Sequence, residues 1–200
     1  ALTKGSVTIK NPLFSDDTQA MIACLKKLGI EIIVAPNSIT VKGSINDIKE
    51  TNYNLDANLS GTTIRFILAL ATIIPGSKTI CGKEGLNKRP IAGLVDGLKQ
   101  LGAKIEYLEK EGYPPLLVTS SKLSSGTINM SGSVSSQYFS SLLMIAPLIE
   151  KVTINVTDEQ ISKPYIDMTI DSMKQFGISV INHGYKSYEV PKGKYTQSEY

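Results

Sequence analysis

Residues 58–66 have the types and the spacing that suit the binding of an anion. They join a short extended run to an apolar run, and Ser60 or Thr62 is a natural N-cap for a helix that begins there. Such a helix points free backbone N–H groups and its positive end at a ligand, and Gly61 lets that ligand approach the backbone. Arg65 is one of only two arginines in the chain, and its planar guanidinium binds carboxylate or phosphate bidentately. A capped core helix with an arginine at its edge is the alternative.

Polar side chains also gather where four further helices are expected to begin. They are Asp16, Asp17, Lys88, Arg89, Ser135, Ser136, Gln137, Ser162 and Lys163, with Tyr165 just inside the last of these helices. Helix N-termini with serines and an arginine form an anion site without any special motif. We therefore expect a small ligand that carries phosphate or carboxylate, although N-capping explains each serine equally well by itself.

Three segments share one pattern, namely a short strand, a polar loop, an amphipathic helix and a glycine. The glycines are Gly29, Gly102 and Gly177. Apolar residues precede each glycine at the same spacing of three and four, which predicts one buried helix face in each copy. Hairpins are expected to close the copies at residues 30–41, 103–118 and 178–190. Leading strands are expected at residues 53–57 and 126–130, each followed by an apolar and therefore buried helix, at residues 60–74 and 133–149.

The predicted fold class is mixed α/β (α+β), a threefold repeat of a β-α-β-α-β-β unit around buried helices. The whole chain, residues 1–200, is expected to form a single domain. The copies run over about residues 1–41, 53–118 and 126–190, and residues 191–200 form a linker-like tail. The first copy lacks its leading strand and helix, so we expect it to be truncated and the chain to be part of a longer protein.

Composition and charge exclude several classes of function. The net charge is only +3 and the lysines are scattered, so nothing indicates nucleic-acid binding. The longest apolar run, residues 64–74, is too short to cross a membrane, and the N-terminus does not read as a signal peptide. The two cysteines, Cys24 and Cys81, lie in apolar segments and are expected to be reduced in a cytoplasmic protein. With His183 as the only histidine, we expect no metal and no nucleophilic triad.

Four motifs resemble those of the 5-enolpyruvylshikimate-3-phosphate (EPSP) synthase family. They are residues 59–66 (Leu-Ser-Gly-Thr-Thr-Ile-Arg-Phe), 88–91 (Lys-Arg-Pro-Ile) with 111–116 (Glu-Gly-Tyr-Pro-Pro-Leu), 132–138 (Gly-Ser-Val-Ser-Ser-Gln-Tyr) and 162–167 (Ser-Lys-Pro-Tyr-Ile-Asp). The resemblance runs from about Gly5 to Val190. It implies most of the N-terminal domain of a two-domain fold, in which helix N-termini from both domains face a cleft.

The resemblance also implies a role for each candidate residue. Shikimate-3-phosphate would contact Ser135, Ser136, Gln137, Ser162 and Tyr165; phosphoenolpyruvate would contact Gly61, Arg89 and Gln137; Arg65 and Asp17 would line the same site. The implied reaction transfers the enolpyruvyl group to the sugar 5-hydroxyl and releases phosphate, a step of the shikimate pathway of aromatic amino-acid biosynthesis. No cofactor is implied, glyphosate is the implied inhibitor, and no catalytic residue is expected in this chain because the acid and base belong to the second domain.

Several departures and alternatives accompany this resemblance. Leu59 stands where the family usually has asparagine, which predicts an altered affinity for phosphoenolpyruvate or glyphosate. The family's early Gly-Ser-Lys-Ser segment and its second domain do not occur in this sequence. A sister enzyme, the UDP-N-acetylglucosamine enolpyruvyl transferase, has a cysteine in the loop before its Arg-Pro motif, whereas residues 82–88 contain none. A non-catalytic module that binds an anionic metabolite is the alternative from another class.

Overall fold

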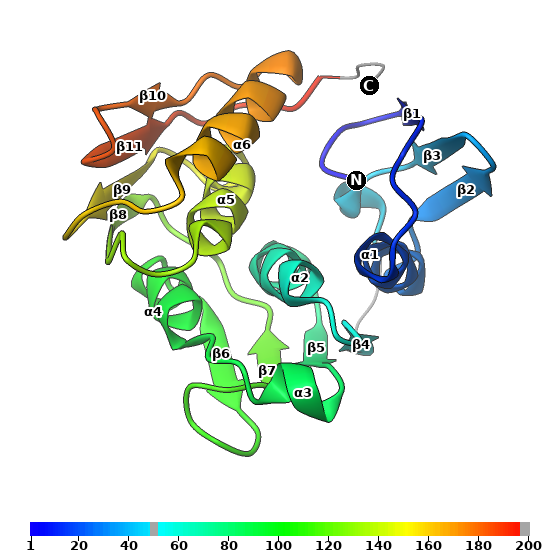
Figure 1. Ribbon diagram of the computed structural model, residues 1–200, viewed down its shortest axis with the longest axis horizontal. Coiled ribbons are helices and arrows are strands. Elements are labelled where there is room, and N and C mark those ends of the chain that lie inside the picture. Colours follow the sequence, from blue (N-terminus) through cyan, green and yellow to red (C-terminus); the bar gives the residue numbers. More distant parts are fainter. Residues whose placement is uncertain (49–51, 197–200) are drawn as a thin grey trace.

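The structure, a computed structural model, describes residues 1–48 and 52–196, so the end of the predicted 191–200 tail lies outside the described residues. Its elements form three groups, each built on one sheet (Figure 1). The first group contains β1 (Ser6–Lys10), α1 (Asp16–Lys27), β2 (Glu31–Ala35), β3 (Ser38–Lys42) and the short helix η1 (Ile45–Asp47). The second contains β4 (Asn52–Asp56), α2 (Gly61–Ile73), β5 (Ser77–Cys81), α3 (Glu84–Asn87), α4 (Ala92–Gln100), β6 (Lys104–Tyr107) and β7 (Leu116–Thr119). The third contains β8 (Gly126–Met130), α5 (Ser136–Ile145), η2 (Ala146–Leu148), β9 (Val152–Val156), α6 (Lys163–Gln175), β10 (Ile181–Asn182) and β11 (Ser187–Val190).

The second and third sheets have the same topology. Their strand orders are β4-β5-β7-β6 and β8-β9-β11-β10, with a parallel pair at one end and an antiparallel hairpin at the other. The first sheet, β1-β3-β2, has the antiparallel part alone among the described residues. A mixed α/β fold with three sheets is therefore confirmed, while the threefold repeat of one β-α-β-α-β-β unit stays a prediction.

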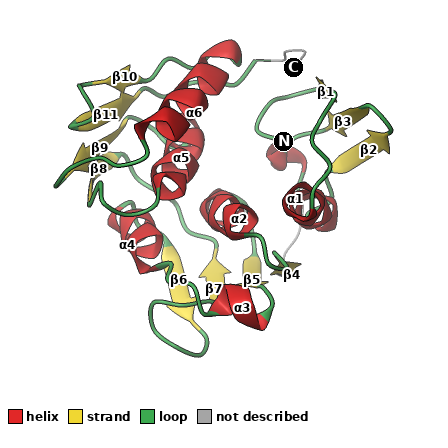
Figure 2. Ribbon diagram, in the orientation of Figure 1, coloured by secondary structure: helices red, strands yellow, loops and turns green. Residues whose placement is uncertain are grey.

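The leading helices α2 and α5 lie inside the molecule and the strands lie around its outside (Figure 2). Ten of the 13 residues of α2 and eight of the 10 residues of α5 are buried. The two helices pack against each other, α1 packs against α2, and α6 packs against α5. Exposing apolar surface to water is unfavourable, and both helices are apolar nearly all round. Their central position therefore follows from their composition.

The helices α1, α4 and α6 are each followed by a glycine with a left-handed backbone conformation, as predicted. Gly29, Gly102 and Gly177 have φ angles of +89°, +94° and +84°, the left-handed conformation that ends a helix at low cost only for glycine. On α4 the predicted face is fully buried. On α6 it is buried at Ile166 and Met173 and half-buried elsewhere.

The predicted face of α1 is wrong in part. Met21, Ile22 and Leu25 of that face are half-buried and pack against the core, and Leu28 is buried as predicted. Ala20 and Cys24, which lie outside the predicted face, are buried as well. The reason is tertiary: α1 packs against α2 and β4, and the Cys24 thiol donates to the Asp56 carbonyl of β4 at 3.4 Å. The side of α1 that faces these neighbours is rotated from the side that the apolar spacing favours.

A buried lysine closes the C-terminal end of α2. The ammonium of Lys78, 0% exposed, donates to the carbonyl oxygens of Ala71 (3.0 Å), Ile74 (2.6 Å) and Gly76 (2.9 Å). The last carbonyls of a helix have no partner within the helix, and a cation there also opposes the negative end of the helix dipole. Burial lowers the pKa of Lys78 from 10.5 to about 8, a desolvation cost that the three hydrogen bonds offset.

Replacing this lysine tests whether it supports the fold. Lys78→Ala should lower the free energy of unfolding by about 3 kcal/mol, because it leaves a cavity and three carbonyls without their donor. Urea denaturation monitored by circular dichroism measures the change. Lys104→Ala on β6 is the control, since that lysine is exposed and unpartnered among the described residues, and it should change stability by less than about 0.5 kcal/mol. If both substitutions lowered the free energy of unfolding equally, Lys78 would have no special part in stabilising the fold.

Candidate functional site

The N-terminus of α2 brings two arginines against one glycine. The hydroxyl of Ser60 caps the helix by accepting from the Thr63 N–H at 3.0 Å. A Cβ added at Gly61 would lie 2.6 Å from Nη1 of Arg89 and 2.7 Å from Nη1 of Arg65. Both guanidinium groups therefore lie close to the backbone at this position, and a side chain at residue 61 would require their ends to shift.

Arg65 is held by the first turns of two helices. Its side chain is only 7% exposed, and its Nη1 donates to the Gly61 carbonyl and to Oε1 of Gln137, both at 2.8 Å. Nε2 of Gln137 in turn donates to the Thr62 hydroxyl at 2.8 Å. The guanidinium carbon lies 5.4 Å from the centre of the Tyr138 ring, within reach of a cation–π interaction. Gln137 thus joins α5 to α2 and fixes one of the two cations.

Arg89 differs from Arg65 because it is exposed. It follows the short helix α3, and its backbone N–H donates to the Leu86 carbonyl at 2.9 Å. The Tyr138 hydroxyl donates to the carbonyl of Pro90 at 2.8 Å, so one tyrosine contacts both arginine segments. Among residues 1–48 and 52–196, no carboxylate pairs with either arginine. The two positive charges are therefore available to an anionic ligand.

The first turn of α5 carries two serines in different states. Ser135 is the N-cap, and its hydroxyl accepts from the Gln137 N–H at 3.3 Å. Ser136 is buried within the fold, and its hydroxyl has no hydrogen-bond partner in the described part of the chain. Capping thus accounts for Ser135, while Ser136 keeps a free hydroxyl at a helix N-terminus.

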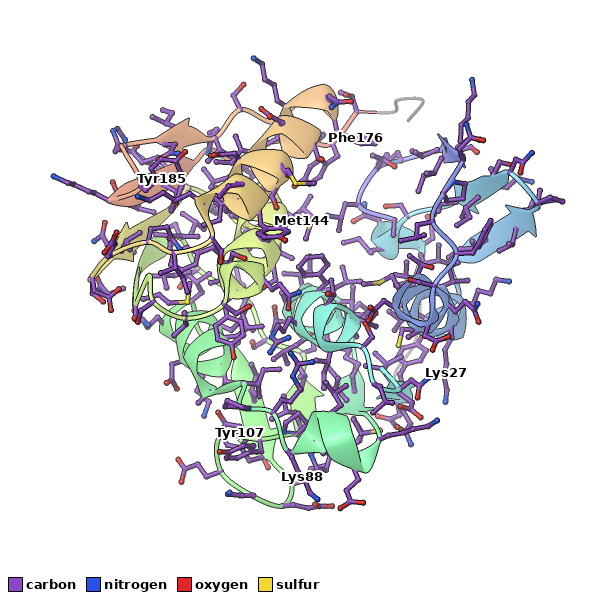
Figure 3. All side chains as sticks on the ribbon, viewed as in Figure 1. Lys27, Lys88, Tyr107, Met144, Phe176 and Tyr185 are labelled. Carbon is purple, nitrogen blue, oxygen red and sulfur yellow. The ribbon has the colours of Figure 1, made fainter. Side chains whose placement is uncertain are left out.

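A cleft of ≈ 950 Å³ collects most of the candidate residues. The candidates that line it are Arg65, Arg89, Ser135, Ser136, Gln137 and Tyr165, together with Thr62. Its remaining wall is largely apolar and includes Val7, Ile9 and Val41 of the first group and Met144 and Phe176 of the third. Figure 3 labels Met144 and Phe176. No described lining residue is an aspartate, glutamate, histidine or lysine, so the cleft is apolar and cationic.

Three predicted residues lie apart from the lining of this cleft. Gly61 is not a lining residue, but it packs against the guanidinium groups of the two arginines that line the cleft. Asp17 contributes its backbone carbonyl, which accepts from the Thr63 hydroxyl at 3.1 Å, while its side chain is exposed in the first turn of α1. Ser162 has a φ of +54° and makes no capping hydrogen bond at the start of α6. Thr62 and Tyr138 hold the site together, and sequence reasoning gave neither this role.

Other kinds of site find little support in the described residues. No group of three or more His, Cys, Asp and Glu side chains in residues 1–48 and 52–196 is arranged to hold a metal ion. Within the same residues, none of the helices has the length and apolarity required to cross a membrane. Cys81 lies on β5, where its thiol is 3.7 Å from Oδ1 of Asn54, and it does not line the cleft.

Comparisons with known proteins find relatives in sequence and in fold. A 3-phosphoshikimate 1-carboxyvinyltransferase of Shewanella sp. (strain ANA-3) is 42% identical over 198 residues, covering 96% of this chain and 46% of the relative. The protein of that name from Vibrio cholerae serotype O1 (strain M66-2) is 40% identical over 199 residues, with coverages of 97% and 46%. The chain thus spans about half the length of the curated relatives it matches. The solved EPSP synthase from Acinetobacter baumannii shares the fold with a TM-score of 0.87 at 20% identity, covering 100% of this chain and 45% of that one.

The family model described as EPSP synthase (3-phosphoshikimate 1-carboxyvinyltransferase) matches residues 1–199. Because that match covers nearly the whole sequence, the chain belongs to the EPSP synthase family.

Proposed function

We propose that this chain supplies half of the active site of an enzyme that transfers the enolpyruvyl group of phosphoenolpyruvate to the 5-hydroxyl of shikimate-3-phosphate. One observation carries the proposal. Arg65 and Arg89 converge on Gly61 at a helix N-terminus, and no described carboxylate neutralises them. Two cations of this kind at the positive end of α2 suit a ligand with two anionic groups, which phosphoenolpyruvate has.

The two substrates would occupy neighbouring parts of the cleft. Phosphoenolpyruvate would contact Gly61, Arg89 and the side chain of Gln137, beside Arg65. Shikimate-3-phosphate would lie against the N-terminus of α5, where Ser136 has a free hydroxyl, and against Tyr165, which is 65% exposed. Ser162 and Asp17 would come closer to the substrates when the site closes, since neither lines the cleft in this structure.

The reaction needs more than these binding groups. The 5-hydroxyl oxygen attacks C2 of phosphoenolpyruvate and loses its proton, while the methylene carbon gains one. The tetrahedral intermediate then loses phosphate and a methyl proton. Both steps require an acid and a base within hydrogen-bond reach. Because no described lining residue has a carboxylate, imidazole or lysine side chain, we assign these transfers to a second domain that closes over the cleft.

Neither alternative function has an observation that favours it. The UDP-N-acetylglucosamine transferase reading requires a cysteine in the loop before Arg89, and Cys81 is instead held in β5. A non-catalytic binding module differs from the proposed enzyme only in turnover.

Glyphosate, with a carboxylate and a phosphonate, would compete for the phosphoenolpyruvate contacts near Leu59, which is exposed beside Gly85. A cytoplasmic location is part of the proposal.

The first test concerns Arg89 in the complete protein that contains this chain. Arg89→Lys keeps the charge but loses the fork, so the KM for phosphoenolpyruvate should rise about tenfold, which corresponds to about 1.4 kcal/mol. Steady-state phosphate release measures it. Lys88→Ala removes the neighbouring cation, which pairs with Glu84 at 2.6 Å on the surface, and should leave the KM within about twofold. An unchanged KM for Arg89→Lys would return Arg89 to a surface role.

The second test separates ligand binding from helix capping. Ser136→Ala should weaken binding of shikimate-3-phosphate at least about tenfold, because a hydrogen bond to a charged group is worth roughly 1.5–3 kcal/mol. Its melting temperature should hold, since this hydroxyl has no partner in the described protein. Ser135→Ala should also lower stability, by about 1 kcal/mol, because it removes the N-cap. Calorimetry gives affinity and melting temperature on one sample, and a Ser136→Ala protein with normal affinity would contradict the assignment.

The third test addresses the division of labour between the domains. The 200-residue chain alone should release no phosphate from the two substrates, because the described lining of its cleft offers binding groups but no carboxylate or imidazole. Adding a separately produced second domain should restore measurable release. Turnover by the isolated chain would show that the proton transfers occur in this half.

A further inference from the structure

Asp158 connects two loops that are far apart in the sequence. It lies two residues after β9, in the 157–162 loop that leads to α6. Its Oδ2 accepts from the hydroxyls of Ser131 (2.6 Å) and Ser133 (3.2 Å). Its Oδ1 accepts from the backbone N–H of Gly132 and from that of Ser133 at 3.1 Å. One carboxylate therefore takes four hydrogen bonds from the 131–135 loop that leads to α5.

The sheet explains why these loops meet. β8 and β9 are parallel neighbours with Met130 opposite Val156, so both chains leave the sheet at the same edge. Backbone bonds continue the contact, from the Thr157 N–H to the Met130 carbonyl and from the Ile161 N–H to the Gly132 carbonyl, both at 3.0 Å. A Cβ at Gly132 would lie 2.7 Å from the backbone of the other loop, so the two loops pack closely.

The second group joins its corresponding loops differently. There the Lys83 N–H donates to the Asn58 carbonyl at 2.8 Å, a backbone contact like that between Ile161 and Gly132. The nearby Asp56 carboxylate bonds to the N–H of Asn58, in its own loop, at 2.7 Å. Within the described residues no side-chain carboxylate crosses between the loops of that group. The clamp made by Asp158 is thus particular to the third group.

Both clamped loops end at residues that are assigned to shikimate-3-phosphate. The first reaches Ser135 and Ser136 within a few residues, and the second ends at Ser162. Asp158 itself is exposed and does not line the cleft, so it does not touch the ligand. Hydrogen bonds, the largest from Ser131, hold the pKa of its carboxyl below the usual range, so it stays charged at neutral pH.

We propose that Asp158 is a positioning residue, which sets the spacing between the N-termini of α5 and α6 and thereby the fit of shikimate-3-phosphate. The inference rests on the proposed function, because it names which half of that site depends on the clamp. Phosphoenolpyruvate should depend on it less, since Gly61 and Arg89 belong to the second group, and the amide of its third contact, Gln137, is held by Arg65 and Thr62 of α2 and not by Asp158.

The test uses the complete protein with Asp158→Ala, Asp158→Asn and Glu159→Ala. Asp158→Ala should raise the Kd and KM for shikimate-3-phosphate at least about fivefold, because loose loops misplace their serines, and leave the KM for phosphoenolpyruvate within about twofold. Asp158→Asn should recover most of the affinity, since its carbonyl still accepts from the two N–H groups and its amide can donate to the hydroxyls. Glu159→Ala removes an equal charge from an exposed neighbour without a partner among the described residues and should change neither constant.

Each result decides between the possibilities. Wild-type-like affinity in Asp158→Ala, with wild-type protein active, would overturn the inference and leave the proposed function intact. So would a rise of both KM values by the same factor with a fall in melting temperature, which marks general loosening. A wild-type protein that neither binds shikimate-3-phosphate nor releases phosphate would overturn the proposed function, and the inference with it.

Discussion

The hydrogen bonds of Gln137 join the first turns of α2 and α5, and the candidate site depends on that junction. The amide oxygen of Gln137 accepts a hydrogen bond from the Arg65 guanidinium, and the amide nitrogen donates to the Thr62 hydroxyl. A buried cation is costly unless polar groups surround it, and here the Gly61 carbonyl, the Gln137 amide and the Tyr138 ring supply that environment. Both α2 and α5 are mostly buried and pack against each other. The position of the Arg65 charge is therefore set by how these two helices pack.

Much of the fold could be predicted because its local patterns are strong. Apolar spacing and a following glycine gave α4 and its left-handed exit at Gly102, and the all-round apolar segment gave the burial of α2. The buried line of α1 could not be predicted, because contacts with α2 and β4 favoured small Ala20 and Cys24 over larger residues nearby. Periodicity within one segment contains no information about which neighbour that segment will meet.

The residues of the candidate site could be predicted in part, but their geometry could not. Helix starts with serines and arginines pointed to the cleft that now contains Arg65, Arg89 and Ser136. The partnership of Tyr138 with both arginine segments could not be derived, since it joins residues about fifty to seventy positions apart. The role of Asp158 could not be predicted for the same reason, because its four hydrogen-bond donors belong to another loop of the chain.

The sequence separation of the site's contacts has a consequence for the order of folding. The hydrogen bonds of the site span 46, 72 and 75 residues, from Thr63 to Asp17 and from Gln137 to Arg65 and Thr62. The hairpins of each sheet, by contrast, close over short loops, and short loops form faster and at a lower entropic cost. The three groups should therefore acquire structure before the cleft does, and the cleft should be the last feature to assemble. A ligand that binds only the assembled cleft then favours the completed chain over every partly folded form by mass action.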